Sequence, residues 1–355
     1  MSYLDSKRIV GTNSQRTGSF ANITGGWKEV GRTTLGSSGD TIDVTSLPDK
    51  RYYMILMDYR DTGGQINTNM TINNDTGNNY ARRWSTDGAT DSTQTSRNSM
   101  NHGHYTANDG YAVAYLSNVS SKEKLLMSHS VANHSGTGAG TAPNRNEFVG
   151  KWANTSNVVS SIKHTNSDTG SFTSGSEVVV LGYNPDDTHT DNFWEELASV
   201  ELTSTNTVLD SGTFTAKKYL WIQLFAKANT SLTSIGGRYN GDTGNNYANR
   251  YSDNGGTDGT NTSQPIHTWT LGGNLASGET QFTNVFVINN ASNEKLSICH
   301  TVEKGTSGAG TAPTRRETVG KWANTTDQIT QVQLVRTNTT GDFASGSFIK
   351  VWGSN

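Results

Sequence analysis

The side chains of this chain that could take part in chemistry occur twice, at matched positions. An arginine, a glutamate, a lysine and a tryptophan form one block and recur at the same spacing: Arg145, Glu147, Lys151 and Trp152, then Arg315, Glu317, Lys321 and Trp322. Alternate residues of a β-strand point to the same face. Each Arg–Glu pair therefore predicts an ion pair within or between subunits. The tryptophans predict core or interface packing, and the alternative for the whole block is a surface that binds a sugar.

Catalysis by carboxylates has no support in the spacing. A glycosidase needs two carboxylates that face one groove. Three pairs of acids are retained in both copies, namely Glu123 and Glu294, Glu147 and Glu317, and Asp75 and Asp242. No spacing brings two of them together, and the chain has no nucleophile elbow, phosphate loop, H-E-x-x-H motif or Cys–His pairing. We therefore expect a protein that is not an enzyme.

A repeated acidic loop raises the question of a metal site. The heptapeptide Asp-Thr-Gly-Asn-Asn-Tyr-Ala begins at Asp75 and again at Asp242, and further aspartates follow both loops. The spacing lacks the alternate acidic ligands and the closing glutamate of a calcium loop. Gly77 and Gly244, each followed by asparagine, are typical of a tight turn that uses a left-handed residue. We predict a structural turn and no cofactor, with Ca²⁺ as the alternative.

One histidine in each copy alternates with apolar residues. His129 and its counterpart His300 share a strand face with residues such as Leu125 and Met127. This pattern predicts a neutral histidine in the core, with a pH-sensitive contact as the alternative. The single cysteine, Cys299, can form no disulfide within the chain and is predicted to be a small buried side chain.

The register of the repeat can be followed almost from end to end. The second copy lies 167 residues downstream over residues 27–96, 171 downstream over 113–129 and 170 downstream over 138–155. In the last block, 15 of the 18 residues are identical. A period of this length is far beyond that of solenoids and propeller blades, which is about 20 to 50 residues. Each copy is therefore predicted to be a whole domain.

The composition favours short strands over helices. Only 32% of the 355 residues are hydrophobic, and glycine, serine, threonine and asparagine dominate the remainder. Serine, threonine and asparagine side chains compete for backbone hydrogen bonds in helices. The matched strand candidates are 27–35 with 194–202, 52–59 with 219–226, 80–85 with 247–252, 111–116 with 282–288, 125–131 with 296–302, 147–153 with 317–323, and 177–183 with 348–352. Further candidates are 41–44, 66–72 and 158–163.

These strands predict an all-β protein of two tandem jelly-roll-like β-sandwich domains. An immunoglobulin-type sandwich, which usually needs about 100 residues, is the alternative. We assign residues 1–25 to an N-terminal arm, 26–184 to the first sandwich, 185–192 to a linker and 193–355 to the second sandwich. The linker assignment follows from its proline and its acidic residues.

Charge and hydropathy exclude several classes of function. The formal charge is −3 and no basic run occurs, so binding to nucleic acid through a charged face has no support. The N-terminus lacks the apolar core of a signal peptide, and no apolar stretch approaches the length of a membrane span. We expect a protein made in a host cytoplasm, with no membrane association.

The repeated blocks resemble proteins that are abundant in marine bacteriophages and related viral metagenomes. The resemblance lies in residues 138–155, in the heptapeptide at 75–81, and in Ser-Leu-Pro-Asp-Lys-Arg-Tyr at 46–52, and it extends over the arm and both copies. It implies a virion structural component with a β-sandwich fold, in the capsid, a capsid decoration or the tail. It supplies no catalytic residues.

We therefore expect a non-enzymatic virion protein whose partners are further copies of itself and other virion proteins. The alternative is a lectin-like carbohydrate-binding module that adheres to a host surface. The arm is expected to order against a neighbouring subunit, and a disordered tail is the alternative.

Overall fold

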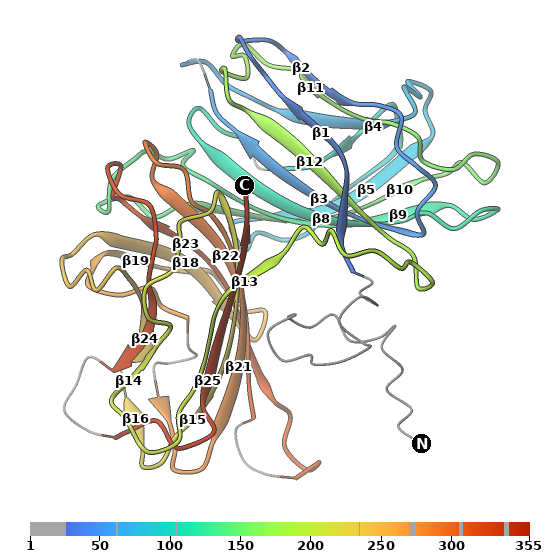
Figure 1. Ribbon diagram of the computed structural model, residues 1–355. Helices are drawn as coiled ribbons and strands as arrows, with labels where there is room; N and C mark the ends of the chain where they lie inside the picture. Colours follow the sequence, from blue (N-terminus) through green and yellow to red (C-terminus); the bar gives the residue numbers. More distant parts are fainter. Residues whose placement is uncertain are drawn as a thin grey trace, which may run out of the picture. The chain divides into compact units, whose positions relative to one another are not determined.

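The computed structural model describes residues 26–355, apart from 62, 104, 234, 270–273, 305–307 and 337–340. The regular structure of the described residues is β throughout, from β1 to β25 (Figure 1). Within these residues, no helix is long and apolar enough to span a bilayer. The predicted N-terminal arm, residues 1–25, lies outside the described residues.

The chain folds into two compact units. Of the described residues, the first unit contains those within 26–86, 90–132 and 146–195, and the second contains those within 87–89, 133–145 and 196–355. The predicted division assigned residues 87–89 and 133–145 to the first sandwich, whereas both segments belong to the second unit. Two loops of the first sequence copy thus form part of the second unit.

The first unit is a sandwich of two antiparallel sheets. The larger sheet has the order β1-β12-β3-β8-β9-β10-β5-β6, and the smaller has the order β2-β11-β4-β7. The strands of the larger sheet are β1 (Lys28–Thr34), β12 (Glu177–Tyr183), β3 (Tyr52–Tyr59), β8 (Gly110–Ser117), β9 (Lys124–Ala132), β10 (Asn144–Trp152), β5 (Tyr80–Thr86) and β6 (Ser92–Arg97). Those of the smaller sheet are β2 (Thr41–Val44), β11 (Ile162–Asn166), β4 (Thr68–Ile72) and β7 (Met100–Asn101).

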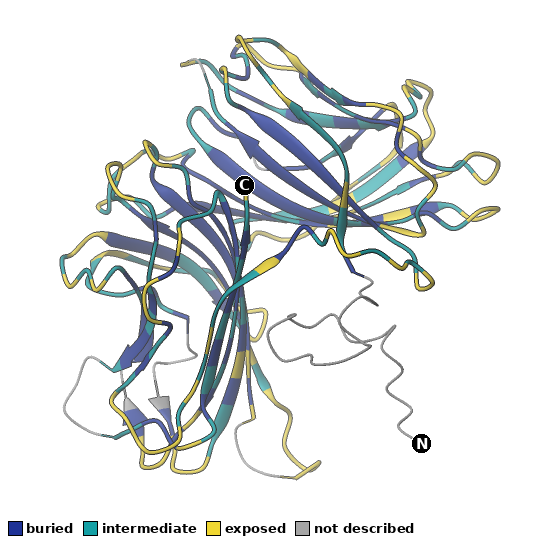
Figure 2. Ribbon diagram, viewed as in Figure 1, coloured by how far each residue is buried: buried dark blue, intermediate teal, exposed yellow. Residues whose placement is uncertain are grey.

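Alternation along the strands builds the core of this unit. On β3, Tyr53, Ile55 and Met57 point inward, where they join Ile42 and Ile162 of the smaller sheet in one buried cluster. Successive side chains of a strand point to opposite faces, so the residues between them lie on the outward face of the larger sheet. Figure 2 shows the strands largely buried and the connecting loops exposed.

The second unit repeats this architecture. Its larger sheet has the order β13-β25-β15-β21-β22-β23-β18-β19, which matches that of the first unit strand for strand. These strands are β13 (Glu195–Glu201), β25 (Phe348–Ser354), β15 (Tyr219–Lys227), β21 (Thr280–Ile288), β22 (Lys295–Glu303), β23 (Thr314–Trp322), β18 (Tyr247–Asp253) and β19 (Gly259–Gln264). Opposite it lie β14 (Val208–Asp210), β24 (Val332–Arg336) and β17 (Ile235–Tyr239), with a pair formed by β16 (Leu232–Thr233) and β20 (Asn274–Leu275).

The core of the second unit forms between its sheets in the same way. Leu220, Ile222 and Leu224 of β15 pack in one buried cluster with Val332 and Leu334 of β24. The shared strand order confirms the prediction of two tandem, jelly-roll-like β-sandwich domains that arose by duplication.

Candidate functional site

The repeated heptapeptide forms a turn that its own side chains hold in place. Asp75 Oδ1 accepts a hydrogen bond from the Gly77 amide at 2.9 Å, and Asp75 Oδ2 accepts bonds from Asn79 Nδ2 at 2.9 Å and from Trp152 Nε1 at 2.7 Å. In the second unit, Asp242 makes the matching bonds, including 2.7 Å to Trp322 Nε1. The motif therefore couples a surface turn to the tryptophan of a distant strand.

The glycine of this turn is required for a reason that differs from the prediction. Gly77 does not adopt a positive φ, whereas Asn73 and Asn74 do, both at 54°. A Cβ on Gly77 would lie 2.8 Å from Asn79 Nδ2. The prediction of a left-handed glycine is thus wrong. A larger residue at this position would displace the Asn79 side chain from its hydrogen bonds with Asp75.

The turn aspartates are engaged by N–H donors. Burial raises the pKa of Asp75, but the hydrogen bonds from Trp152, Asn79 and Gly77 outweigh it and lower the pKa below its usual value. The described residues contain no group of three or more histidine, cysteine, aspartate or glutamate side chains that could hold a metal ion. The alternative of a Ca²⁺ site therefore has no support in the described part of the chain.

The two tryptophans of the repeated block are core residues. Trp152 and Trp322 are each 1% exposed. Lys124 Nζ lies 5.8 Å from the ring centre of Trp152, and Lys295 Nζ lies at the same distance from Trp322. These tryptophans belong to no exposed ligand surface, because the alternation of β10 and β23 turns them inward.

Three histidines that the sequence analysis did not single out occupy the cores. His102 and His164 of the first unit are fully buried, with Nδ1 of the first 2.8 Å from Nε2 of the second. His267 of the second unit is also buried, and its Nδ1 lies 2.9 Å from Asn249 Oδ1. Burial lowers the pKa of His102 and of His267 to about 3 and that of His164 well below 6.5. All three are neutral at pH 7.

The predicted placement of His129 and His300 in the cores is wrong. Both are only partly buried. On β9, Leu126 points into the core, whereas Leu125 and Met127 are 56% and 54% exposed. The alternating apolar residues of this strand therefore mark the outward face of the sheet, and His129 shares that face.

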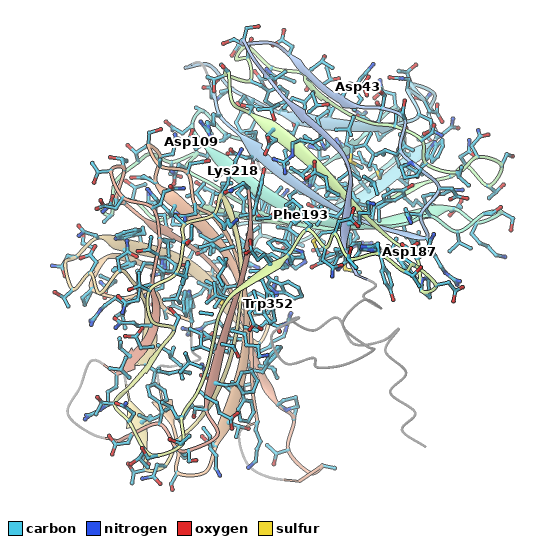
Figure 3. All side chains as sticks on the ribbon, in the orientation of Figure 1. Asp43, Asp109, Asp187, Phe193, Lys218 and Trp352 are labelled. Carbon is cyan, nitrogen blue, oxygen red and sulfur yellow. The ribbon has the colours of Figure 1, made fainter. Side chains whose placement is uncertain are left out.

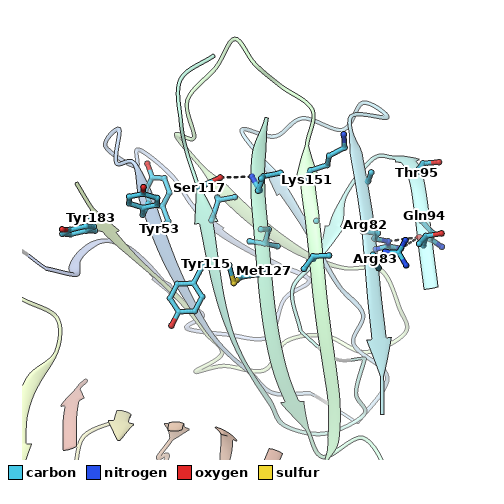
Figure 4. A pocket seen from close by; sticks show the side chains of 18 of the residues that line it. Tyr53, Arg82, Arg83, Gln94, Thr95, Tyr115, Ser117, Met127, Lys151 and Tyr183 are labelled. Carbon is cyan, nitrogen blue, oxygen red and sulfur yellow. Dashed lines mark hydrogen bonds between the residues drawn. The ribbon is translucent and has the colours of Figure 1, made fainter. Parts of the chain in front are cut away.

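The outward face of the first unit carries a groove of about 930 Å³. We use the name groove for the surface formed by Trp27, Tyr52, Tyr115 and Tyr183 at one end, Leu125, Met127 and Val149 in the middle, and Arg83, Thr93, Thr95 and Lys151 at the other end. Figure 4 shows Tyr115, Met127 and Lys151 on adjacent strands of the sheet.

The aromatic end of the groove is a packed cluster. The Trp27 ring lies 5.8 Å from that of Tyr183 and 6.3 Å from that of Tyr115. Tyr52 stacks on Tyr183 at 6.4 Å and remains 37% exposed. This end offers ring faces and phenol groups to a ligand.

The opposite end of the groove is charged but internally paired. Lys151 Nζ lies 2.9 Å from Glu123, and Arg83 Nη1 lies 3.3 Å from Asp91. All four side chains are about half exposed, so each pair contributes only about 0 to 1 kcal/mol and can exchange partners. Between the two ends, Val149 is 50% exposed beside Leu125 and Met127.

The matched positions of the second unit are covered. Leu296, Ile298, Val319 and Lys321 are all 3% exposed or less. The segment 133–145, which we call the plug, makes contacts along this face. Its hydrogen bonds are Asn133 Nδ2 to Glu294 at 2.8 Å, Lys321 Nζ to the Gly136 carbonyl at 2.9 Å, the Ser263 amide to the Ala139 carbonyl at 2.7 Å and Arg250 Nε to the Pro143 carbonyl at 3.0 Å, with a further bond from the Gly138 amide to Glu294.

The charges of the repeated block complete these contacts. Arg145, at the end of the plug, pairs with Asp258 at 2.6 Å and with Glu317 at 3.2 Å. Arg315 also pairs with Glu317. The prediction that Glu317 has basic partners is confirmed. In the first unit, Lys151 lies at the polar end of the groove.

The second unit has its own aromatic cluster outside its core. Trp352 of β25, labelled in Figure 3, lies with its ring 5.0 Å from that of Trp221, which in turn stacks on Phe286 at 5.7 Å. Aromatic side chains therefore gather on the larger sheet of both units.

Comparison with known proteins supplies no family. No protein-family profile and no curated protein matches the chain. Among solved structures, it is similar to domains LG4-5 of the mouse laminin alpha1 chain, with 10% identity, 92% of this chain and 90% of that chain covered, and a TM-score of 0.19. It is also similar to a mutant of alginate lyase Aly36B in complex with alginate tetrasaccharide, with 10% identity, 44% and 79% covered, and a TM-score of 0.22. TM-scores this low carry no argument about function.

Proposed function

We propose that the chain is a non-enzymatic structural protein whose groove binds another protein. The observation that carries this proposal is the middle of the groove, where Leu125, Met127 and Val149 are each half exposed on one sheet face. A contiguous apolar surface on a soluble protein marks an interaction site.

The composition of the groove fits a protein interface. Tyrosine, tryptophan, methionine and arginine are enriched in such interfaces, and polar groups form the rim around an apolar centre. Tyr52, Trp27, Met127 and Arg83 are of these types. The acids beside the groove, Glu123 and Asp91, are each paired with a base. That pairing supports a binding role over catalysis by two facing carboxylates.

More specifically, we propose that the chain is a component of a virion, located in the capsid, in a capsid decoration or in the tail. Its support is the resemblance of the repeated blocks to marine bacteriophage proteins. The partners in this proposal are further copies of the chain and other virion proteins, and the chain resides in the virion.

The test is binding of the full chain to viral particles purified from a culture that produces it. The wild-type protein is expected to co-sediment with the particles, and Met127→Glu, which places a charge in the apolar centre, is expected to bind at least tenfold more weakly. Thr205→Glu serves as the control, because Thr205 is exposed in the second unit and belongs neither to the groove nor to the strands that carry the repeated block. Absence of the chain from the particles by mass spectrometry would refute the virion assignment.

A second candidate, a glycan-binding module, is favoured by one observation, the aromatic end of the groove. Exposed ring faces stack on sugar rings, and Tyr52 and Trp27 present such faces. A glycan array with the full chain tests it. Binding that is lost in Tyr52→Ala but kept in Tyr52→Phe would establish this candidate.

A further inference from the structure

Both the plug and the face that it contacts have a counterpart in the other sequence copy. The second unit holds the plug through Glu294, Lys321, Arg250, Ser263, Asp258 and Glu317. The first sequence copy retains the same residue type at every one of these positions: Glu123, Lys151, Arg83, Ser96, Asp91 and Glu147. Of these six, Arg83 and Lys151 line the groove, and Glu123 and Asp91 pair with them beside it. The larger sheet of the first unit therefore has the residue types of a second plug-binding face.

The backbone of the two faces is also alike. Ser96 of β6 and Ser263 of β19 both have a positive φ, of 51° and 50° respectively. β6 and β19 are the matching edge strands of the two larger sheets. In the second unit, the amide of Ser263 is the donor to the plug. Because both serines have this unusual φ, the backbone at Ser96 in the first unit has the same local conformation as the backbone at Ser263 in the second.

A second plug is present in the second sequence copy. Residues 138–143 and 308–313 are identical, and an arginine follows two residues later in both, Arg145 and Arg315. We call residues 308–315 the open loop. Residues 308–313 and Arg315 are exposed, whereas Pro143 and Arg145 of the plug are buried.

The open loop has the same anchor as the plug. The amide of Arg145 donates to Asp87 Oδ1 at 2.8 Å, and the amide of Arg315 donates to Asn254 Oδ1 at 3.0 Å. In return, the amides of Asp87 and Asn254 donate to the carbonyls of the two arginines. The base of the open loop therefore requires no rearrangement before it binds.

We propose that the open loop of one chain binds in the groove of a second copy of this chain, as the plug binds within the second unit. This inference rests on the proposed function, because it names the protein that occupies the groove. Arg315 then pairs with Asp91 and Glu147 of the neighbour, and the Gly308 amide donates to Glu123. Arg83 donates to the Pro313 carbonyl, and the Ser96 amide donates to the Ala309 carbonyl.

The apolar and charged contacts of this complex are complementary. Leu125, Met127 and Val149 correspond to the covered Leu296, Ile298 and Val319 and are close to them in volume. Arg315 brings a positive charge to Asp91 and Glu147. Each chain has one groove and one open loop, so the contact is heterologous and chains join head to tail into a ring or a filament.

The experiment is sedimentation velocity of the full-length chain over a range of concentrations. The wild type is expected to form oligomers of increasing size. Arg315→Glu reverses the charge of the open loop and leaves the groove intact, whereas Met127→Glu blocks the groove and leaves the open loop intact. Both altered side chains are more than half exposed, so the folds are retained, and each variant alone is expected to be monomeric.

Mixing the two variants supplies the decisive result. The open loop of the Met127→Glu chain can bind the groove of the Arg315→Glu chain, and the product has no further site for growth. A 1:1 dimer that does not grow with concentration is therefore expected, and Thr205→Glu is expected to behave as the wild type. Wild-type oligomers that persist in Arg315→Glu, or a mixture that stays monomeric, would overturn the inference.

The outcomes also separate this inference from the proposed function. If the wild type is monomeric but its binding to viral particles is lost in Met127→Glu and kept in Arg315→Glu, the groove binds a different protein. In that case the inference fails and the proposed function stands. If Met127→Glu changes neither self-association nor particle binding, both fail.

Discussion

Acidification is expected to destabilise the first unit because of its buried histidine pair. His102 and His164 lie in contact in the core and are neutral at pH 7. Their folded pKa values lie below those of the unfolded chain, about 6.5. The unfolded state therefore binds more protons than the folded state once the pH falls below about 6.5, and stability is lost as the pH drops toward the folded values.

The size of the effect at pH 5 follows from the unfolded value. A histidine that stays neutral in the folded state and titrates at about 6.5 when unfolded costs about 2 kcal/mol at pH 5. Since burial lowers the pKa of His102 and of His267 to about 3, both stay neutral at pH 5. Each unit should therefore lose about 2 kcal/mol between pH 7 and pH 5 through these histidines, and the lowered pKa of His164 adds to the loss in the first unit.

Urea denaturation at the two pH values, followed by tryptophan fluorescence, measures these losses. Calorimetry identifies the transition of each unit. In His267→Gln the pH dependence of the second unit should fall by about 2 kcal/mol while that of the first unit is unchanged. Equal stability of the wild type at pH 5 and pH 7, or an NMR titration that places the pKa of His102 near 6.5, would refute the reasoning.

Two further predictions use matched pairs within the chain. Gly77→Ala should cost about 0.5 to 1.5 kcal/mol, because its Cβ would lie 2.8 Å from Asn79 Nδ2 and would displace that group from its hydrogen bonds with Asp75. Gly140→Ala, which meets nothing within 4 Å, should stay within about 0.5 kcal/mol of the wild type in the same urea titration, and equal effects would contradict the assigned role of Gly77. Leu126→Ala should cost about 2 to 5 kcal/mol and Leu125→Ala less than about 1, since the former is 3% and the latter 56% exposed. The reverse order of midpoints would show that the face of β9 is wrongly assigned.

The sequence predicted the duplication and most strands of the larger sheets because their apolar alternation is strong. It did not predict β6 and β19. These edge strands read Ser-Thr-Gln-Thr-Ser-Arg and Gly-Thr-Asn-Thr-Ser-Gln, and they contain no apolar residue. An edge strand exposed on both faces buries no side-chain pattern, so only its backbone pairing with β5 or β18 defines it.

The site could be predicted only in part. The matched Arg–Glu positions indicated ion pairs, and Glu317 has them. The prediction of which face of β9 is buried was wrong. Alternation indicates that Leu125 and Met127 share a face, but it does not indicate whether that face points into the core. Because residues 138–143 and 308–313 are identical, the sequence also gives no sign that the plug is covered and the open loop exposed. Only the folded structure shows this difference in exposure.

The plug has a consequence for how the chain can be divided. A fragment cut near residue 192 would separate the second sandwich from residues 133–145, although these residues supply hydrogen-bond acceptors to Lys321 and Arg250. Lys321 is fully buried, so its ammonium group would lose one of its partners. The boundary read from the sequence is therefore not a boundary at which the polypeptide can be cut without loss.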